Sequence, residues 1–278
     1  MSNQRTHHIT TSDGVNIGGT VHGQGPPLVF LHGMLGDGDV DFGQLVQFLS
    51  DRFTCYLPSQ RGRGLSGDHP DLSYQRQVED YLAYIRSIGE PTSLVGWSGG
   101  AWPALDAARQ SEAVAAVALV EPESVGLAEE DEKAAFGAAA ARAGELASGG
   151  DLQAAVRPFA DFVFNDEEKS ELGESGYLGA VARYIPTLLS FLQQLMAFME
   201  DGGRTADHPA VLGEVSSPVL VLGGSDTKPL ASTTARHVVD HVQDGEIKEI
   251  RGAGHAVPLT HPEALASELT EFFASVRV

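Results

Sequence analysis

The chain of 278 residues contains one cysteine, Cys55, so no disulfide within the chain can form. Cys55 lies in the largely apolar run Phe53–Leu57 with no motif around it, and we expect a buried strand thiol without a catalytic role. Basic residues are scarce as well, 18 Lys and Arg against 38 Asp and Glu, which gives a formal net charge of −20. Such a surface repels nucleic-acid phosphates and anionic lipids, so we expect neither a nucleic acid nor a membrane as partner.

Long hydrophobic runs are missing too. The longest, Ala113–Val120, is too short to span a bilayer. The segment Met1–Asp13 is polar and has no apolar stretch of the kind found in a signal peptide, so we expect a cytoplasmic protein. The length and the 42% hydrophobic content suit one large α/β domain, or one such domain with an insertion. The oligomeric state is left open.

What the chain does contain is a regular alternation of strand and helix patterns. The expected strands are His7–Thr11 and Val15–His22, which form a hairpin, then Leu28–Leu31, Phe53–Leu57, Ser93–Val95, Val114–Val120, Val219–Leu222 and Ile247–Ile250. Helical periodicity is found at Phe42–Leu49, Ser73–Ile88, Trp102–Gln110, Ser232–Val242 and Pro262–Ala274. This alternation predicts an α/β fold with a mostly parallel, eight-stranded sheet flanked by helices.

The alternation stops between residues 125 and 206. This stretch has helical patterns without a strand signal, so we expect a helical insertion at 125–206 into a core made of residues 1–124 and 207–278. Its segment Leu178–Met199 is apolar almost all round, which predicts burial on more than one face, with a minority of side chains closing a pocket. Pro186 should kink this helix or begin a new one.

The most informative motif is Gly96-Trp97-Ser98-Gly99-Gly100, a G-x-S-x-G sequence that follows an apolar run and precedes a helical segment. In this arrangement the serine lies on a sharp strand-to-helix turn with its hydroxyl exposed, and the helix N-terminus favours negative charge there. The motif predicts that Ser98 is a catalytic nucleophile.

A serine hydroxyl needs a base within hydrogen-bond reach, and the base needs an orienting carboxylate. His255 lies in a glycine-rich loop after the strand Ile247–Ile250, and Asp226 lies in the turn after the strand Val219–Leu222. We therefore predict a catalytic triad of Ser98, Asp226 and His255. Glu121 and Glu123 follow the strand Val114–Val120 and are the alternative acids if Asp226 points away.

The second requirement is a pair of backbone N–H groups that stabilise a developing oxyanion. We expect them at Met34, after a His-Gly turn that ends a strand, and at Gly99, next to the nucleophile. Trp97 and Met34 flank the expected point of attack, and Gly33 and Trp97 are candidate substrate contacts. We expect His32 to hold the loop by hydrogen bonds rather than to act as an acid or base.

Taken together, these pieces resemble the α/β-hydrolase superfamily, specifically single-domain serine hydrolases with a helical cap. The resemblance extends over nearly the whole chain. The matching segments are His32-Gly33, the loop 58–66, Gly96–Gly100, Gly223–Asp226 and Gly254-His255. It implies that residues 125–206 form a cap over the site. Ser59 departs from the family pattern, in which aspartate is usual; that difference bears on loop stability rather than chemistry.

Two further patterns are weak indications of a cofactor or metal site. Gly62–Gly67 fits G-x-G-x-x-G, but a dinucleotide site needs a helix that begins inside the motif, and here His69-Pro70-Asp71 prolongs the loop. His237 and His241 have a metal-ligand spacing without an accompanying carboxylate motif, and a solvated helix face explains them. We therefore expect no metal and no cofactor.

These residues predict a serine hydrolase that cleaves an ester, thioester or lactone of a small, largely apolar and uncharged molecule through an acyl-Ser98 intermediate. Alternatives that use the same fold are a carbon–carbon bond hydrolase and a cofactor-independent perhydrolase or oxygenase. From a different class, a ligand-sensing protein with slow turnover also stays open. A turnover assay with short p-nitrophenyl esters separates an enzyme from a sensor.

Overall fold

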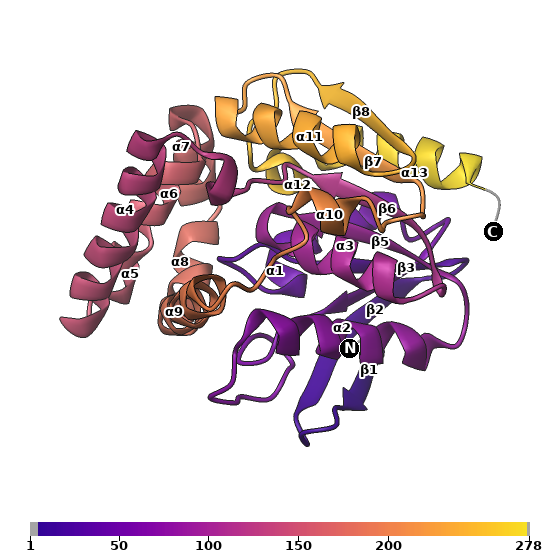
Figure 1. Cartoon of the computed structure of the whole chain (residues 1–278), viewed down its shortest axis with the longest axis horizontal. Coiled ribbons are helices and arrows are strands. Elements are labelled where there is room, and N and C mark those ends of the chain that lie inside the picture. The colour runs from indigo at the N-terminus through magenta and orange to yellow at the C-terminus, as the bar shows by residue number, and fades with distance from the viewer. Residues whose placement is uncertain (1–4, 277–278) are drawn as a thin grey trace.

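The computed structural model describes residues 5–276, whose centre is one eight-stranded sheet (Figure 1). Its strands, in chain order, are β1 (Arg5–Thr10), β2 (Asn16–Gly23), β3 (Pro27–Leu31), β4 (Thr54–Pro58), β5 (Thr92–Trp97), β6 (Val114–Val120), β7 (Val219–Gly224) and β8 (Gly245–Ile250). The spatial order is β1-β2-β4-β3-β5-β6-β7-β8. Residues 1–4 and 277–278 of the predicted core lie outside the described range.

The sheet is parallel from β4 to β8, and only β2 pairs antiparallel, with β1 and with β4. The carboxyl ends of β3, β5, β6, β7 and β8 therefore meet at one edge, where sites of α/β proteins form. The register opposes Trp97 of β5 to Val120 of β6, so the residues that follow these two strands are neighbours. The prediction of a mostly parallel eight-stranded sheet flanked by helices is confirmed.

Helices cover both faces of this sheet (Figure 1). One face packs against α2 (Tyr74–Ile88), α3 (Ala101–Gln110) and α11 (Pro229–His241), which share a cluster of buried apolar side chains with it. The other face packs against the short helices near Phe42 and against α13 (Pro262–Ser275). Burial of both faces explains why the central strands are continuous apolar runs rather than alternating ones.

The helix predicted at Phe42–Leu49 is two shorter elements, α1 (Gly38–Phe42) and the 3₁₀ turn η1 (Leu45–Phe48). α1 begins earlier than predicted because the Asp37 side chain accepts hydrogen bonds from the backbone N–H groups of Asp39 and Val40. The earlier start places Asp41 inside α1, next to the loop that follows β3.

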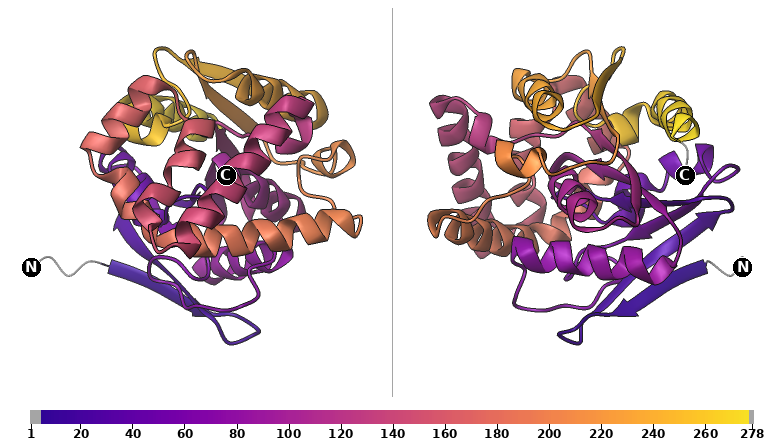
Figure 2. Two further views of the ribbon diagram at one scale, coloured as in Figure 1. Left: turned by 90° about the vertical axis from the view of Figure 1, so that its left-hand side faces the viewer. Right: turned by 45° about the vertical axis from the view of Figure 1, so that its right-hand side comes forward.

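Between β6 and β7 every regular element is helical. These elements are η3 (Val125–Leu127), α4 (Glu130–Ser148), α5 (Leu152–Ala155), α6 (Arg157–Val163), α7 (Asp166–Glu174), α8 (Tyr177–Val181), η4 (Ala182–Tyr184), α9 (Ile185–Glu200) and α10 (Pro209–Leu212). We call residues 125–206 the helical insertion. In Figure 1 its helices α4 to α9 stand together beside the sheet, and Figure 2 shows the same group from two other sides. Its buried side chains join one apolar cluster with the sheet.

The apolar segment 178–199 begins a new helix at Pro186, one of the two outcomes predicted for this proline, because proline fits the first turn of α9. Burial on more than one face is found for part of α9. Leu188 and Leu192 join the cluster shared with the insertion, while Phe191 and Phe198 also pack against the cluster of α2 and α3. The prediction was wrong for Met196 and Met199, which are 57% and 45% exposed.

Within the part of the chain that the structure describes, none of the helices combines the length and apolar character needed to cross a membrane.

Candidate active site

Ser98 lies on the turn between β5 and α3, in a left-handed backbone conformation with φ of +52°. This conformation is strained for a residue with a side chain, and it persists only where the surroundings hold it. The glycines of the motif allow the turn: a Cβ on Gly100 would lie 2.1 Å from the Leu31 carbonyl oxygen. Ser98 is therefore held at the carboxyl edge of the sheet, and it is 8% exposed.

His255 reaches Ser98 from the loop after β8. Its Nε2 lies 3.0 Å from Ser98 Oγ, within hydrogen-bond distance, and the imidazole is 3% exposed. The indole Nε1–H of Trp97 donates to the His255 carbonyl oxygen at 2.9 Å, so the residue before the serine also fixes the backbone of the histidine. The structure thus brings together the predicted nucleophile and the predicted base.

The acid differs from the prediction. The carboxylate nearest to His255 Nδ1 is that of Glu121, with Oε2 at 3.4 Å, followed by Glu123, with Oε1 at 3.7 Å. Asp226 is exposed, and its carboxylate accepts the Ser225 hydroxyl instead. Its backbone N–H donates to the Ala253 carbonyl. The assignment of Asp226 as the partner of His255 is corrected, and the alternative acids after β6 take its place.

Glu121 is the better fixed of the two glutamates. It is fully buried, and its carboxylate accepts hydrogen bonds from the Gly224 N–H at 2.6 Å and from the Thr227 hydroxyl. Its φ of +48° is a second strained conformation at this edge of the sheet. His255 Nδ1 has no hydrogen bond of good geometry to any residue in 5–276, and the Glu121 carboxylate faces it. Contacts of this kind often tighten only when substrate binds.

Charge around His255 is strongly negative. Burial alone lowers the pKa of the imidazole, but Glu123, Glu121 and Glu168 outweigh it and raise that pKa to about 9. Burial raises the pKa of the Glu123 carboxyl, against the opposing effect of His255. The site therefore stabilises the positive charge that a general base acquires when it takes a proton.

This electrostatic arrangement predicts an alkaline pH profile. His255 must be neutral to accept the Ser98 proton, so kcat/KM for an uncharged ester should rise with pH and level off only above about pH 9. The measurement is kcat/KM from pH 5 to 10, corrected for spontaneous hydrolysis. Glu123→Gln should move the midpoint to lower pH, because it removes a negative charge beside the imidazole. A wild-type profile already flat at pH 7 would contradict this.

The other side of the site is the loop after β3. The Gly33 N–H donates to Asp41 Oδ2 at 2.9 Å, so it is already bonded, which leaves the next amide, that of Met34, as the candidate donor. Gly99 lies against Met34, since a Cβ on Gly99 would be 2.4 Å from Met34 Cγ. The oxyanion hole of Met34 and Gly99 stays a prediction. His32 holds the loop as expected: it donates from Nδ1 to the Gly33 carbonyl and accepts the Gln60 N–H at Nε2.

Asp41 and Tyr177 were missed from the sequence. Asp41 is fully buried, and besides the Gly33 amide it accepts the Tyr177 hydroxyl at 3.0 Å. Burial raises the pKa of the Asp41 carboxyl well above its usual range. Tyr177 belongs to the helical insertion, so this bond joins the insertion to the loop of the predicted oxyanion hole. A single aspartate in an acidic stretch gives no sequence signal for such a contact.

Comparison with known proteins agrees with this geometry. Residues 28–268 match the Alpha/beta hydrolase family. The chain belongs to this family. It is 30% identical to a pimeloyl-[acyl-carrier protein] methyl ester esterase of Methylococcus capsulatus, with 91% of this chain and 96% of the relative covered. It is also 28% identical to a 2-(acetamidomethylene)succinate hydrolase of Mesorhizobium japonicum, with 90% and 88% covered.

Among solved structures, an alpha/beta hydrolase of Sphaerobacter thermophilus is similar, with a TM-score of 0.73, 26% identity, and 96% of this chain and 100% of that chain covered. The esterase RhEst1 of a Rhodococcus species has the same fold, with a TM-score of 0.75 at 22% identity over 98% and 99% of the two chains.

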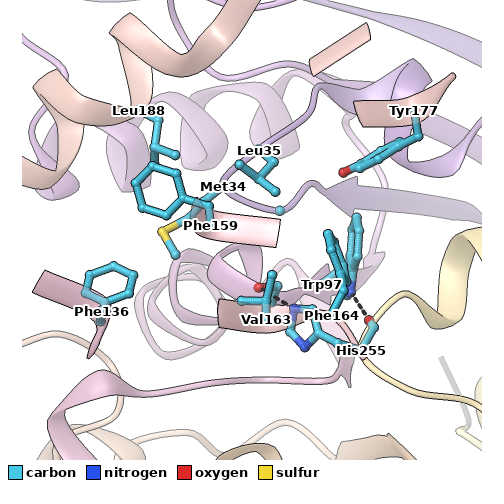
Figure 3. Close-up of a pocket in the computed structure, with 12 residues that line it drawn as sticks. Met34, Leu35, Trp97, Phe136, Phe159, Val163, Phe164, Tyr177, Leu188 and His255 are labelled. Carbon is cyan, nitrogen blue, oxygen red and sulfur yellow. Dashed lines mark hydrogen bonds between the residues drawn. The ribbon is translucent and has the colours of Figure 1, made fainter. Parts of the chain in front are cut away.

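A small pocket of this alpha/beta hydrolase opens onto Ser98, with a cavity volume of about 40 Å³ (Figure 3). It is lined by Gly33, Met34, Leu35, Trp97, Ser98, Phe136, Phe159, Val163, Phe164, Tyr177, Leu188 and His255. Gly33 and Trp97 are thus at the pocket wall, and their contact with a substrate stays a prediction. From α9 only Leu188 reaches it; Phe191 and Phe198 do not line it, and Phe198 stacks on Tyr74 instead. The phenylalanines of the wall come from α4, from α6 and from the position directly after α6, and Trp97 and Tyr177 add two further aromatic rings.

No group of three or more His, Cys, Asp or Glu side chains within residues 5–276 is arranged to hold a metal ion. The Gly62–Gly67 loop is followed by irregular chain up to Tyr74, where α2 begins, so no helix N-terminus faces a phosphate there. Ser59 lies buried in the preceding loop, where its hydroxyl contacts the Gly38 amide.

Proposed function

We propose that this alpha/beta hydrolase cleaves a carboxylic ester, thioester or lactone by way of an acyl-Ser98 intermediate. The observation that carries the proposal is the 3.0 Å contact between Ser98 Oγ and His255 Nε2 at the floor of an apolar pocket. The esterase and the hydrolase among the relatives support the same reaction class.

The groups act in a defined order. His255 Nε2 takes the hydroxyl proton as Ser98 Oγ attacks the carbonyl carbon, and the N–H groups of Met34 and Gly99 stabilise the oxyanion. His255 then returns the proton to the leaving oxygen or sulfur. In the second half-reaction His255 Nε2 takes a proton from water as the water oxygen attacks the acyl carbon. The bond to Ser98 Oγ then breaks, His255 returns the proton to that oxygen, and the acid is released. Throughout, Glu121 faces Nδ1 and stabilises the charged imidazole.

Charge and volume limit the substrate. The carboxylates of Glu121, Glu123 and Glu168 act on His255 from close range, which disfavours an anionic group near the reacting carbonyl. A cavity of about 40 Å³ holds roughly three water-sized groups, at about 10–15 Å³ each. We therefore propose a short, uncharged acyl group.

This proposal predicts a chain-length limit that the pocket wall sets. Across p-nitrophenyl acetate to octanoate, kcat/KM should rise about fourfold per methylene until the pocket is filled, at about 0.8 kcal/mol each, and then fall. Phe136→Ala and Leu188→Ala remove side chains from the wall and should move the optimum to longer chains. Phe198→Ala is the matched control, because Phe198 packs on Tyr74 outside the pocket. An optimum that stays in place in both pocket variants would mean that the acyl group binds elsewhere.

A further inference from the structure

The first turn of α7 in the helical insertion contains a buried carboxylate, Glu168, that is 5% exposed. Its neighbours Asp166, Glu167 and Glu171 on the same helix are exposed. Glu168 closes a capping box with Asn165: its Oε2 accepts the Asn165 N–H at 3.0 Å, and Asn165 Oδ1 accepts the Glu168 N–H at 2.9 Å. This box satisfies the helix end, but it uses only one oxygen of Glu168.

The second oxygen crosses to the core. Glu168 Oε1 accepts the Ala256 N–H at 2.6 Å, and the Asn165 amide group donates to the Asp226 carbonyl at 3.4 Å. One helical turn of the insertion therefore holds the two loops that follow β7 and β8. Neither bond is needed to cap α7. Both instead connect α7 to loops of the core.

The Ala256 N–H belongs to the same peptide unit as the His255 carbonyl. That unit is held at both ends: Trp97 Nε1–H donates to its oxygen at 2.9 Å, and Glu168 accepts from its nitrogen at 2.6 Å. Trp97 is the residue before the nucleophile, and Glu168 comes from the insertion. The backbone that carries the base is thus located by both parts of the molecule.

Gly254 shows how closely the two parts fit. A Cβ at this position would lie 2.6 Å from Glu168 Cδ and 2.6 Å from Asn165 Nδ2. A side chain at residue 254 would therefore have to displace the ends of the Glu168 and Asn165 side chains. The Gly-His-Ala sequence is therefore matched to the first turn of α7 as well as to the catalytic geometry.

From these contacts we propose that Glu168 is a positioning residue: its carboxylate holds the 255–256 peptide so that His255 Nε2 stays in line with Ser98 Oγ only while the insertion is seated on the core. The inference rests on the proposed function for its kinetic part. It links the segment that forms the pocket wall to the alignment of the general base. Opening of the insertion at α7 releases the Ala256 amide and loosens the base.

The test compares Glu168→Ala and Glu168→Gln with Glu171→Ala, a matched loss of an exposed carboxylate on the same helix. Glu168→Ala should lower kcat for p-nitrophenyl acetate by about 10²-fold, the scale of a 1 Å misplacement, with little change in KM. Glu168→Gln has one acceptor oxygen for two donors, the Asn165 and Ala256 N–H groups, so its kcat should lie between those of Glu168→Ala and wild type. Glu171→Ala should match wild type.

Two readouts do not depend on turnover. Hydrogen exchange of the peptide that contains Ala256 should speed up in Glu168→Ala and stay unchanged in Glu171→Ala. NMR titration of His255 should show a lower pKa in both Glu168 variants, because the negative charge of Glu168 is lost. The other charged groups that face the imidazole remain in both variants: Glu121 and Glu123 after β6, with Lys228 of the β7–α11 loop beside Glu123. If Glu168→Ala fails to fold, Glu168→Asp decides: it keeps the charge but is one methylene shorter, so exchange at Ala256 should still speed up and kcat should still fall.

Unchanged exchange at Ala256, or unchanged kcat despite faster exchange, would overturn the inference. A fall in thermal stability with full kcat would assign Glu168 to helix capping alone. If wild type turns over no ester, the proposed function fails separately, while exchange and the His255 titration still test the position of the loop.

Discussion

Ser98→Ala is expected to abolish ester turnover, with a loss in kcat on the order of 10⁶-fold, the size found when the nucleophile of a serine triad is removed. The physical reason is that, among residues 5–276, no second hydroxyl forms a hydrogen bond with the imidazole of His255. The Ser98 hydroxyl is the one in contact with the imidazole of His255, at 3.0 Å. The fold should survive, because the serine side chain adds little to packing at this turn. The measurement is kcat for p-nitrophenyl acetate together with the circular dichroism spectrum.

Covalent labelling gives an independent check. A fluorophosphonate should modify wild type once, at the peptide that contains Ser98, and should leave Ser98→Ala unmodified by mass spectrometry. Ser170→Ala, at an exposed serine of α7, is the control and should label like wild type. Cys55 is not expected to react, since burial raises the pKa of its thiol to about 12. A single label at any other residue would remove Ser98 from its role.

The second large effect concerns the acid. Glu121→Gln should lower kcat by about 10⁴-fold, as loss of the orienting carboxylate does in serine proteases. The Gly224 N–H would hold the amide oxygen of the glutamine, which leaves its NH₂ group toward His255. Nδ1 of His255 would then have to accept a hydrogen bond, and Nε2 would carry the proton and could not take one from Ser98.

Asp226→Asn is the matched control and should stay within about twofold of wild type, because its exposed carboxylate contacts Ser225 rather than His255. Glu123→Gln should change the pH midpoint more than the maximal kcat, since Glu123 lies 3.7 Å from Nδ1 and is second in distance. If Glu121→Gln kept nearly full activity and Asp226→Asn were inactive, Asp226 in the turn after β7 would be the acid of the triad.

Local patterns were sufficient for the strands and for the turn at Ser98. All eight predicted strands overlap observed ones. For β3, β5, β6 and β7 the signal was a short apolar run, which burial on both faces of a parallel sheet demands. The turn at Ser98 was predictable since its glycines are required within a few residues of the serine. His255 followed from a glycine-rich loop after the last strand, at the edge where β5 also ends.

The acid shows where local pattern fails. Glu121 and Asp226 both follow a strand at the same edge, so the sequence offered either of them. The choice depends on backbone bonds across the sheet: the Ala253 carbonyl holds the Asp226 amide, and the Gly224 amide holds the Glu121 carboxylate. These bonds join residues 27 and 103 positions apart, and such contacts leave no periodic trace in either segment.

The sequence by itself determined the α/β architecture, the helical nature of residues 125–206, the serine at the turn and the histidine opposite it, because each depends on residue types within one short segment. Only the tertiary structure decided that Glu121 faces the base, that Glu168 and Tyr177 of the insertion reach the two catalytic loops, and that aromatic side chains of α4 and α6 close the pocket. The physical reason is the same for all three. Each is a contact between distant parts of the chain, and its partners are selected by distance and direction in the folded protein rather than by their order along it.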